Sequence, residues 1–221
     1  MEEGFHPPVE EYLETVHSLT EEGTPVIQAR IAERLGRSAP SVSEMLDRLE
    51  GEGYVRRAGR VVELTDSGSV VAEKVVRRHR LAERLLVDVI GLEWHKVHTE
   101  AGRWEHVISD DVEERLVLLL GDPATCPHGN PIPGSLRPSL LASQMPLTEA
   151  EPGQDVRLER ISEDVELDTS LLSYLSQHGF VPGASAEVSS RTPDGTLVLA
   201  LGGKTVAFGP GLANRLYVSV V

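Results

Sequence analysis

Residues 29–43 read Ala-Arg-Ile-Ala-Glu-Arg-Leu-Gly-Arg-Ser-Ala-Pro-Ser-Val-Ser, a pattern that predicts two short helices joined by a tight turn. The first helix is expected at residues 26–36, because Gly36 suits the left-handed conformation that ends many helices. The second is expected at residues 41–51, with Pro40 placed to start it. Another amphipathic helix is predicted before them, at residues 8–22. The pattern is typical of a helix-turn-helix with a supporting helix.

A β-hairpin is predicted directly after these helices, at residues 53–65, with its turn at Ala58, Gly59 and Arg60. In a winged helix-turn-helix the second helix enters the major groove and the hairpin contacts the backbone or the minor groove. The candidate DNA-contacting residues are Arg30, Ser38, Pro40, Ser41, Ser43, Glu44 and Arg60. The alternative for this segment is an ordinary helical hairpin with a solvated serine face.

The charge distribution favours the DNA-binding interpretation, although the net charge of −14 opposes it. Affinity for nucleic acid comes largely from cations that displace counterions from phosphates. The arginine and lysine residues are concentrated between positions 30 and 84, whereas acidic residues dominate both ends of the chain. The basic region therefore coincides with the predicted helix-turn-helix and hairpin.

The rest of the chain changes from helical to β-type patterns. Helices are predicted at residues 66–90, 93–107 and 110–120, and a proline-rich stretch follows at residues 121–153. Short β-type runs then alternate with turns, with one helix at residues 169–177. Aromatic residues make up only 4% of the chain, which favours packed helices over a large sandwich. The expected fold is mainly α, with a small C-terminal β-barrel.

Composition also restricts the cellular compartment in which the protein is expected. No apolar run approaches the roughly 18 residues that span a bilayer, and the acidic N-terminus lacks a signal-peptide pattern. The single cysteine, Cys126, excludes an intrachain disulfide and fits a reducing compartment. We therefore expect a soluble cytoplasmic protein with no membrane partner.

Histidine and glutamate residues recur at spacings that place them on one face of a helix. His79 and Glu83 are four residues apart, and Glu11 and Glu14 are three apart. A third stripe consists of His98, Gly102, Glu105 and His106. Imidazole and carboxylate together suit divalent cations such as iron(II), manganese(II) or zinc. Singly, each would more often be a solvated or packed side chain.

Gly102 stands out because glycine within a helix costs about 1 kcal/mol relative to alanine. One explanation is that a cation approaches the Gly102 carbonyl closely. A simple packing requirement explains the glycine equally well.

Four runs resemble the diphtheria toxin repressor family, which includes iron-dependent regulators and manganese transport regulators. They are residues 29–43, Arg-His-Arg-Leu-Ala-Glu-Arg-Leu-Leu at 78–86, Arg-Trp-Glu-His-Val-Ile-Ser-Asp-Asp-Val-Glu at 103–113, and Gly-Asn-Pro-Ile-Pro-Gly at 129–134. The resemblance is close over residues 8–134 and loose beyond. It implies a winged-helix domain at residues 1–73, a helical dimerisation and metal-sensing domain at 74–134, a linker at 135–150 and an SH3-like domain at 151–221.

The resemblance also implies two metal sites per subunit. The ancillary site would consist of His79, Glu83, His98, Glu163 and Glu166. Arg80 and Asn130 match positions that hold an anion near this site in some members, but Cys126 replaces the expected serine. Glu166 stands where iron-sensing members usually have glutamine.

The primary, activating site would use Glu105 and His106, together with Glu11, Glu14 and the Gly102 carbonyl. Glu11 replaces a methionine of the iron type and Gly102 replaces a cysteine. Oxygen donors without sulfur favour hard cations. We therefore expect Mn²⁺, with Fe²⁺ as the alternative, to activate a homodimer that binds operator double-stranded DNA and takes no small-molecule substrate.

Two other functional classes are compatible with parts of this pattern. A metalloenzyme could also use histidine and glutamate on helices, but the chain has no nucleophile-plus-base motif or phosphate-binding loop. A metal-independent regulator would use the same residues only structurally. Operator binding with and without chelator distinguishes this regulator from a metal-activated repressor.

Overall fold

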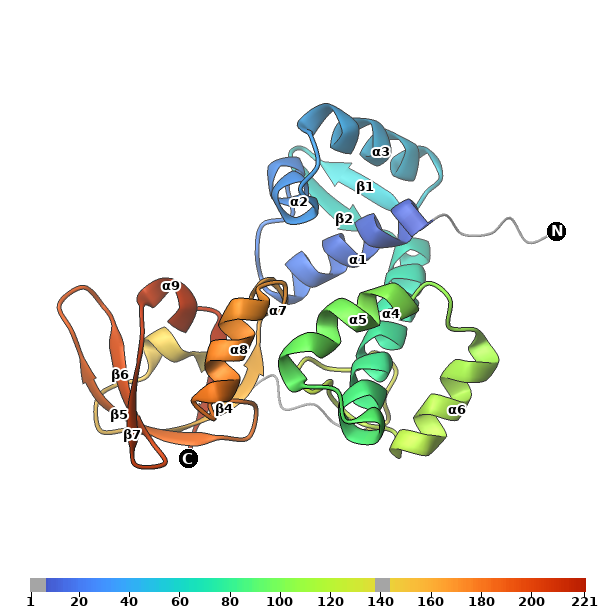
Figure 1. Cartoon of the computed structure of the whole chain (residues 1–221). Helices are drawn as coiled ribbons and strands as arrows, with labels where there is room; N and C mark the ends of the chain where they lie inside the picture. The colour runs from blue at the N-terminus through green and yellow to red at the C-terminus, as the bar shows by residue number, and fades with distance from the viewer. Residues whose placement is uncertain (1–6, 138–143) are drawn as a thin grey trace. The chain divides into compact units, whose positions relative to one another are not determined.

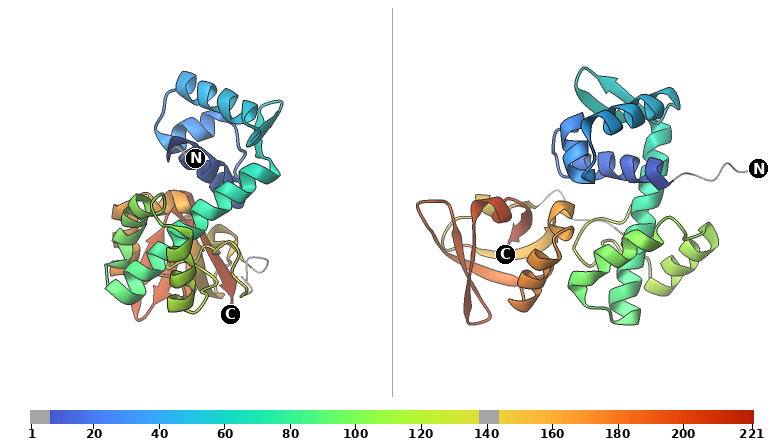
Figure 2. Two further views of the ribbon diagram at one scale, coloured as in Figure 1. Left: turned by 90° about the vertical axis from the view of Figure 1, so that its right-hand side faces the viewer. Right: turned by 45° about the horizontal axis from the view of Figure 1, so that its top comes forward.

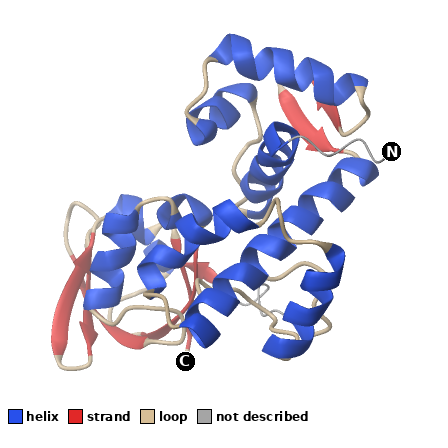
Figure 3. Cartoon of the chain, turned by 45° about the vertical axis from the view of Figure 1, so that its right-hand side comes forward, coloured by secondary structure: helices blue, strands red, loops and turns tan. Residues whose placement is uncertain are grey.

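The computed structural model describes residues 7–137 and 144–221, and it divides into two compact units. The first unit comprises residues 1–79 and 103–109, and the second comprises residues 80–102 and 110–221. Part of the proline-rich stretch predicted from the sequence, residues 138–143, lies outside the described residues. Figure 1 labels the elements, and Figure 3 shows that strands occur in one hairpin and in the C-terminal part of the chain.

The first unit has the predicted order of helices and hairpin. It contains α1 (Pro7–Glu21), α2 (Gln28–Leu35), α3 (Ala39–Gly51), β1 (Val55–Ala58) and β2 (Val61–Leu64), followed by most of α4 (Asp66–Arg84). β1 and β2 pair antiparallel, and β1 packs against α3, as the views of Figure 2 show. The winged helix-turn-helix predicted from the sequence is therefore confirmed.

Local sequence explains the boundaries of the helix-turn-helix. Gly36 has φ 60° and ends α2, and its N–H bonds to carbonyls of that helix. Ser38 caps α3 by accepting the Ser41 N–H at 3.4 Å. On the inner face of α3, Val42, Leu46 and Leu49 are buried. The opposite face of α3 is consequently free for contacts outside the protein.

The helices between residues 66 and 120 differ in detail from the prediction. The expected helix at residues 66–90 is α-helical only to Arg84 and continues as a π-helical segment, Leu85–Ile90. The expected helix at 93–107 consists of a 3-10 turn at Trp94–Lys96 and α5 (Val97–Trp104). The third helix, α6, occupies Asp110–Leu120 as predicted. Hydrophobic periodicity does not distinguish α-helical turns from short π-helical or 3-10 turns.

The C-terminal part of the second unit is a six-stranded antiparallel sheet in the order β3-β8-β4-β5-β6-β7. Its strands are β3 (Met145–Pro146), β4 (Asp155–Ile161), β5 (Ser185–Arg191), β6 (Leu197–Leu201), β7 (Lys204–Phe208) and β8 (Leu216–Val220). Three short helices accompany the sheet: α7 (Glu163–Glu166), α8 (Thr169–Gln177) and α9 (Pro210–Ala213). Apolar side chains of the strands and of α8 form one continuous core. The sequence predicted α8 but not α7, α9 or β3.

Among residues 7–137 and 144–221, no helix combines the length and the apolar character needed to cross a membrane.

Candidate metal centres and nucleic-acid interface

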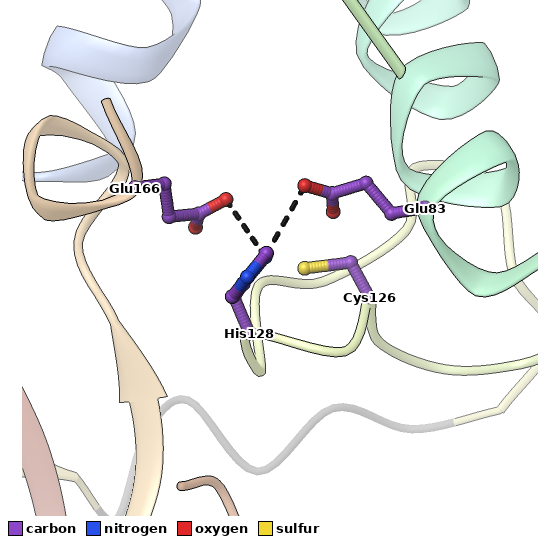
Figure 4. Close-up of side chains that lie close together, drawn as sticks. All are labelled: Glu83, Cys126, His128 and Glu166. Atoms are coloured by element: carbon purple, nitrogen blue, oxygen red, sulfur yellow. Dashed lines mark hydrogen bonds and ion pairs between the residues drawn. The ribbon is translucent and has the colours of Figure 1, made fainter. Parts of the chain in front are cut away.

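The second unit gathers four potential metal ligands in its interior: Glu83, Cys126, His128 and Glu166. One donor atom of each lies within 4.8 Å of the donor atoms of the others, and all four side chains are buried. Figure 4 shows both carboxylates directed toward the His128 ring, with the sulfur of Cys126 beside it. Glu83 belongs to α4 and Glu166 to α7, while Cys126 and His128 belong to the loop after α6. The cluster therefore joins three separate segments of the chain.

Two imidazoles share the two carboxylates of this cluster. His128 Nδ1 lies 3.2 Å from Glu83 Oε1 and 3.0 Å from Glu166 Oε2. His98 Nδ1 lies 3.2 Å and 3.1 Å from the same two oxygens. Burial alone would lower the pKa of His128, but the Glu166 and Glu83 carboxylates outweigh burial and raise this pKa well above its usual value. Without a metal ion, protonated imidazole therefore balances part of the negative charge.

The chemistry of these donors fits a divalent cation. Two carboxylates, an imidazole and a thiol are available in one buried place, and buried negative charge requires compensation. Within the described residues, the buried Nε2 atom of His128 has no hydrogen-bond partner. Burial raises the pKa of the Cys126 thiol to about 12, so only a bound cation would make the thiolate available near neutral pH.

Glycine is required in the loop that carries Cys126 and His128. Gly129 has φ +92°, and a Cβ atom there would lie 2.0 Å from the Glu159 carbonyl oxygen and 2.6 Å from Arg160 Cα. Both are backbone atoms, so relieving either clash would require a shift of the main chain. Gly129 therefore permits the loop to pack directly on β4 and to present His128 to the cluster.

The other residues expected at or near the ancillary site make contacts within the protein. Glu163 forms an ion pair with Arg80 at 3.6 Å. Arg80 also donates to the Pro131 carbonyl, and Asn130 donates to Glu166 and, at 2.9 Å, to the Ile161 carbonyl. Arg80 and Asn130, which the family resemblance assigns to an anion, are thus hydrogen-bonded to protein acceptors. His79 belongs to the first unit and is described with it.

The first unit contains a second group of potential ligands, Glu14, His79 and Glu105, with donor atoms within 4.8 Å of one another. Glu105 contacts His79 Nδ1 and lies 3.1 Å from Nε2 of His106. Burial would raise the pKa of Glu105, but hydrogen bonds from His106 and His79 lower it to about 2. These donors are nitrogen and oxygen atoms, a set that suits a borderline or hard divalent cation.

Glu10, rather than Glu11, reaches the His106 imidazole. The hydrogen bond of Glu10 to His106 Nδ1, with that of Glu105, raises the pKa of His106 to about 10. Glu11 instead lies 3.9 Å from Arg37, and its side chain is 41% exposed. The two carboxylates are adjacent in sequence on α1, so the helix directs only one of them toward His106.

Gly102 belongs to the second unit, and its replacement would meet no steric obstacle. A Cβ atom built at Gly102 has no atom of the described residues within 4 Å. A packing requirement therefore does not explain this glycine. Ligation by its carbonyl stays a prediction.

The candidate DNA-contacting residues occupy the outer face of the helix-turn-helix. Ser38, Pro40, Ser41 and Glu44 are exposed, and Ser43 is half-buried. Much of the neighbouring basic charge is paired: Arg30 with Glu33, Arg48 with Glu52, and Arg56 with Glu63, each at 2.7 Å. Arg60 lies in the exposed turn between β1 and β2. Among the described residues Arg60 forms no ion pair, so we predict that its guanidinium can contact a phosphate.

Replacing Arg60 by alanine should weaken DNA binding by about the same factor on specific and non-specific duplexes. A phosphate contact carries no sequence information, and its loss should reduce the slope of log affinity against log salt concentration by about one. Fluorescence anisotropy at several salt concentrations measures both quantities. Lys204→Ala, at an exposed site on β7, is the matched control, and an unchanged salt slope in Arg60→Ala would exclude the contact.

Sequence reasoning missed three of the clustered side chains: Glu10, Cys126 and His128. The available signal was Cys126-Pro127-His128, because two metal-ligand residue types two positions apart in a loop can reach one ion. Glu10 had no distinguishing signal, since it adjoins Glu11 in the same acidic helix turn.

Comparison with known proteins agrees with this architecture. Residues 5–60 match the model for the iron dependent repressor N-terminal DNA binding domain, and residues 65–134 match that for the iron dependent repressor metal binding and dimerisation domain. Residues 145–220 match the FeoA domain. The iron-dependent repressor IdeR of Mycobacterium tuberculosis is 43% identical over 222 residues, which cover 96% of each chain. The diphtheria toxin repressor of Corynebacterium diphtheriae is 40% identical over 224 residues, covering 95% of each.

Similar solved structures contain bound manganese or zinc. A manganese-dependent transcriptional repressor in complex with manganese has a TM-score of 0.86 and 32% identity, covering 96% of this chain and 100% of that one. The repressor ScaR with bound Zn²⁺ has a TM-score of 0.80 and 30% identity, with coverage of 96% and 99%. The winged helix, the buried ligand clusters and the SH3-like C-terminal domain define a metal-dependent transcriptional repressor rather than an enzyme. The chain belongs to the diphtheria toxin repressor family.

Proposed function

We propose that this protein is a manganese(II)-responsive repressor that controls genes of metal uptake and homeostasis. The observation that carries the choice of metal is the donor set of the first unit. Glu14, His79 and Glu105 lie together there, with His106 in contact with Glu105, and none of them offers sulfur. Hard oxygen donors with imidazole are compatible with Mn²⁺, whose weak intrinsic affinity must be offset by charge and geometry.

The two clusters have different proposed roles. A cation held by the first unit would neutralise Glu14 of α1 and Glu105 of residues 103–109 and tie these two segments of the unit together. Glu105 and His106 would then hold the supporting helix of the helix-turn-helix in place through Glu10 and Glu14. The cluster of Glu83, Cys126, His128 and Glu166 would bind a second cation and fasten the C-terminal sheet domain to the helical part of its own unit. Two metal sites per subunit follow from this assignment.

A second copy of this chain is the proposed partner of the helical part. α6 exposes Leu118 and Leu119, which are 70% and 62% accessible, and the π-helical segment before α5 exposes Val89 and Ile90. Exposed pairs of large apolar side chains are consistent with an interaction surface. The matching family model describes residues 65–134 as a dimerisation domain, which supports a homodimer. A dimer would present two α3 helices to successive major grooves of operator DNA.

Iron(II) is the second candidate effector. The relatives named iron-dependent repressor are 43% identical to this chain over 222 residues, whereas the manganese-dependent repressor structure is 32% identical. Overall identity therefore favours iron, but the composition of the clusters, which decides coordination, favours manganese. We give the cluster more weight because the effector contacts it directly.

A metal-by-metal titration separates the two effectors. A duplex is first selected from a random-sequence pool with the metal-loaded protein, and its affinity is then measured by anisotropy against Mn²⁺, Fe²⁺ under anaerobic conditions, Zn²⁺ and chelator. We expect Mn²⁺ at micromolar levels to strengthen binding. Activation by Fe²⁺ alone would show the manganese assignment to be wrong, and equal binding in chelator would make the protein a metal-independent regulator.

A further inference from the structure

The loop that carries Cys126 and His128 is hydrogen-bonded at every one of four successive carbonyls. The Thr125 carbonyl accepts from Arg84 Nε at 2.7 Å, and the Cys126 carbonyl accepts from Arg84 Nη2 at 3.1 Å and from the Gly129 N–H at 3.0 Å. The Pro127 carbonyl accepts from Trp94 Nε1 at 3.0 Å, and the His128 carbonyl accepts from the Ile161 N–H at 2.9 Å. A loop without regular secondary structure is thereby held from three other segments.

Arg84 makes the largest contribution to this arrangement. Its guanidinium donates to the carbonyls of two consecutive residues and lies 3.3 Å from the Thr125 hydroxyl. Hydrogen bonds from a charged donor are roughly twice as strong as those between neutral groups. Arg84 also directly follows Glu83 on α4, so one turn of helix both contributes a carboxylate and fixes the backbone that carries the thiol.

Trp94 holds the same loop from another side. Its indole N–H bonds to the Pro127 carbonyl, and its ring centroid lies 4.7 Å from that of His128 at an angle of 56°. The ring therefore limits rotation of the imidazole, while the hydrogen bond fixes the backbone next to it. Neither Arg84 nor Trp94 offers a ligand atom to the cluster.

We propose that Arg84 and Trp94 are positioning residues that hold Cys126 and His128 in ligand geometry before a cation binds. This inference rests on the proposed metal site at Glu83, Cys126, His128 and Glu166. Ordering a flexible loop upon binding would cost conformational entropy, and a loop already ordered by Arg84 and Trp94 avoids that cost. The affinity of the site for a cation should therefore depend on two side chains that do not touch the cation.

Cobalt(II) titration of the metal-free full chain tests the proposal, because a thiolate bound to Co²⁺ gives a charge-transfer absorption band. The chain has a single cysteine, so the band reports this cluster alone. In Arg84→Met we expect a parent-like band at saturation but an affinity 10–100-fold weaker, the usual effect of losing a group that orients ligands. Arg84→Lys keeps the charge and should recover part of the loss. Trp94→Phe keeps the ring and loses the hydrogen bond, and it should weaken binding about three- to tenfold.

Arg157→Met is the matched control, because Arg157 is an exposed arginine of β4 whose ion pair with Glu159 is long, at 3.8 Å. Its affinity should stay within twofold of the parent. Circular dichroism establishes which metal-free variants are folded. An affinity within twofold of the parent in folded Arg84→Met would overturn the proposal, and if that variant does not fold, the same result in Trp94→Phe would do so. A parent spectrum identical to that of Cys126→Ser would instead refute the metal site itself.

Discussion

Replacing Glu105 by alanine should abolish the metal-dependent part of operator binding while leaving the protein folded. Glu105 is buried and contacts both His79 and His106, so its carboxylate connects the two imidazoles of the first unit. Alanine would leave these imidazoles without their shared anion, and the affinity of the cluster for Mn²⁺ should fall by more than about a hundredfold. Because metal and DNA affinities are linked, the metal-dependent gain in DNA affinity should disappear with it.

Anisotropy titrations with the selected duplex, with and without Mn²⁺, measure this effect. Analytical ultracentrifugation measures whether the variant keeps the oligomeric state of the parent. Glu149→Ala removes an exposed carboxylate at the end of a 3-10 turn and should behave like the parent. Full metal-dependent affinity in Glu105→Ala would refute the assigned role of Glu105.

Replacing His128 by phenylalanine should destabilise the metal-free protein by about 3 kcal/mol. His128 is fully buried between Glu83 and Glu166, and phenylalanine keeps the ring volume but removes the positive charge. His98 would then be the imidazole left in contact with both carboxylates. For a chain of this size the melting temperature should fall by about 6–12 °C. The same variant should lose the cysteine-dependent Co²⁺ band.

The destabilisation should depend on pH in a defined direction. The folded-state pKa of His128 is raised above its unfolded value of about 6.5, so its contribution is fully present below that pH and is lost as pH rises through the folded-state pKa. The difference between parent and variant should therefore be smaller near pH 9.5 than near pH 7. Thermal unfolding in the presence of chelator measures the stability difference between parent and variant at each pH. His178→Phe, at a partly exposed imidazole ending α8, is the control, and an equal loss there would contradict the buried-charge explanation.

Local sequence determined the helix-turn-helix, the hairpin and most helix boundaries. Gly36, Ser38 and Gly59 act through their own backbone conformation and nearest hydrogen bonds, which depend on few neighbours. Helical spacing singled out Glu14, His79 and Glu105 as potential ligands, and these three are found together in the first unit, although they come from separate segments. Local elements and the residue types able to bind a metal could therefore be predicted without a structure.

Only the tertiary structure decided which ligands share a site. Cys126 and His128 follow Glu83 by 43 and 45 positions and precede Glu166 by 40 and 38 positions. The four residues meet because the loop packs on β4 at Gly129. The choice of Glu10 over Glu11 depends on which side of α1 faces His106, and the pairing of Arg56 with Glu63 depends on strand register. These contacts join segments distant in sequence, and their geometry is set by packing of the whole unit rather than by local conformational preference.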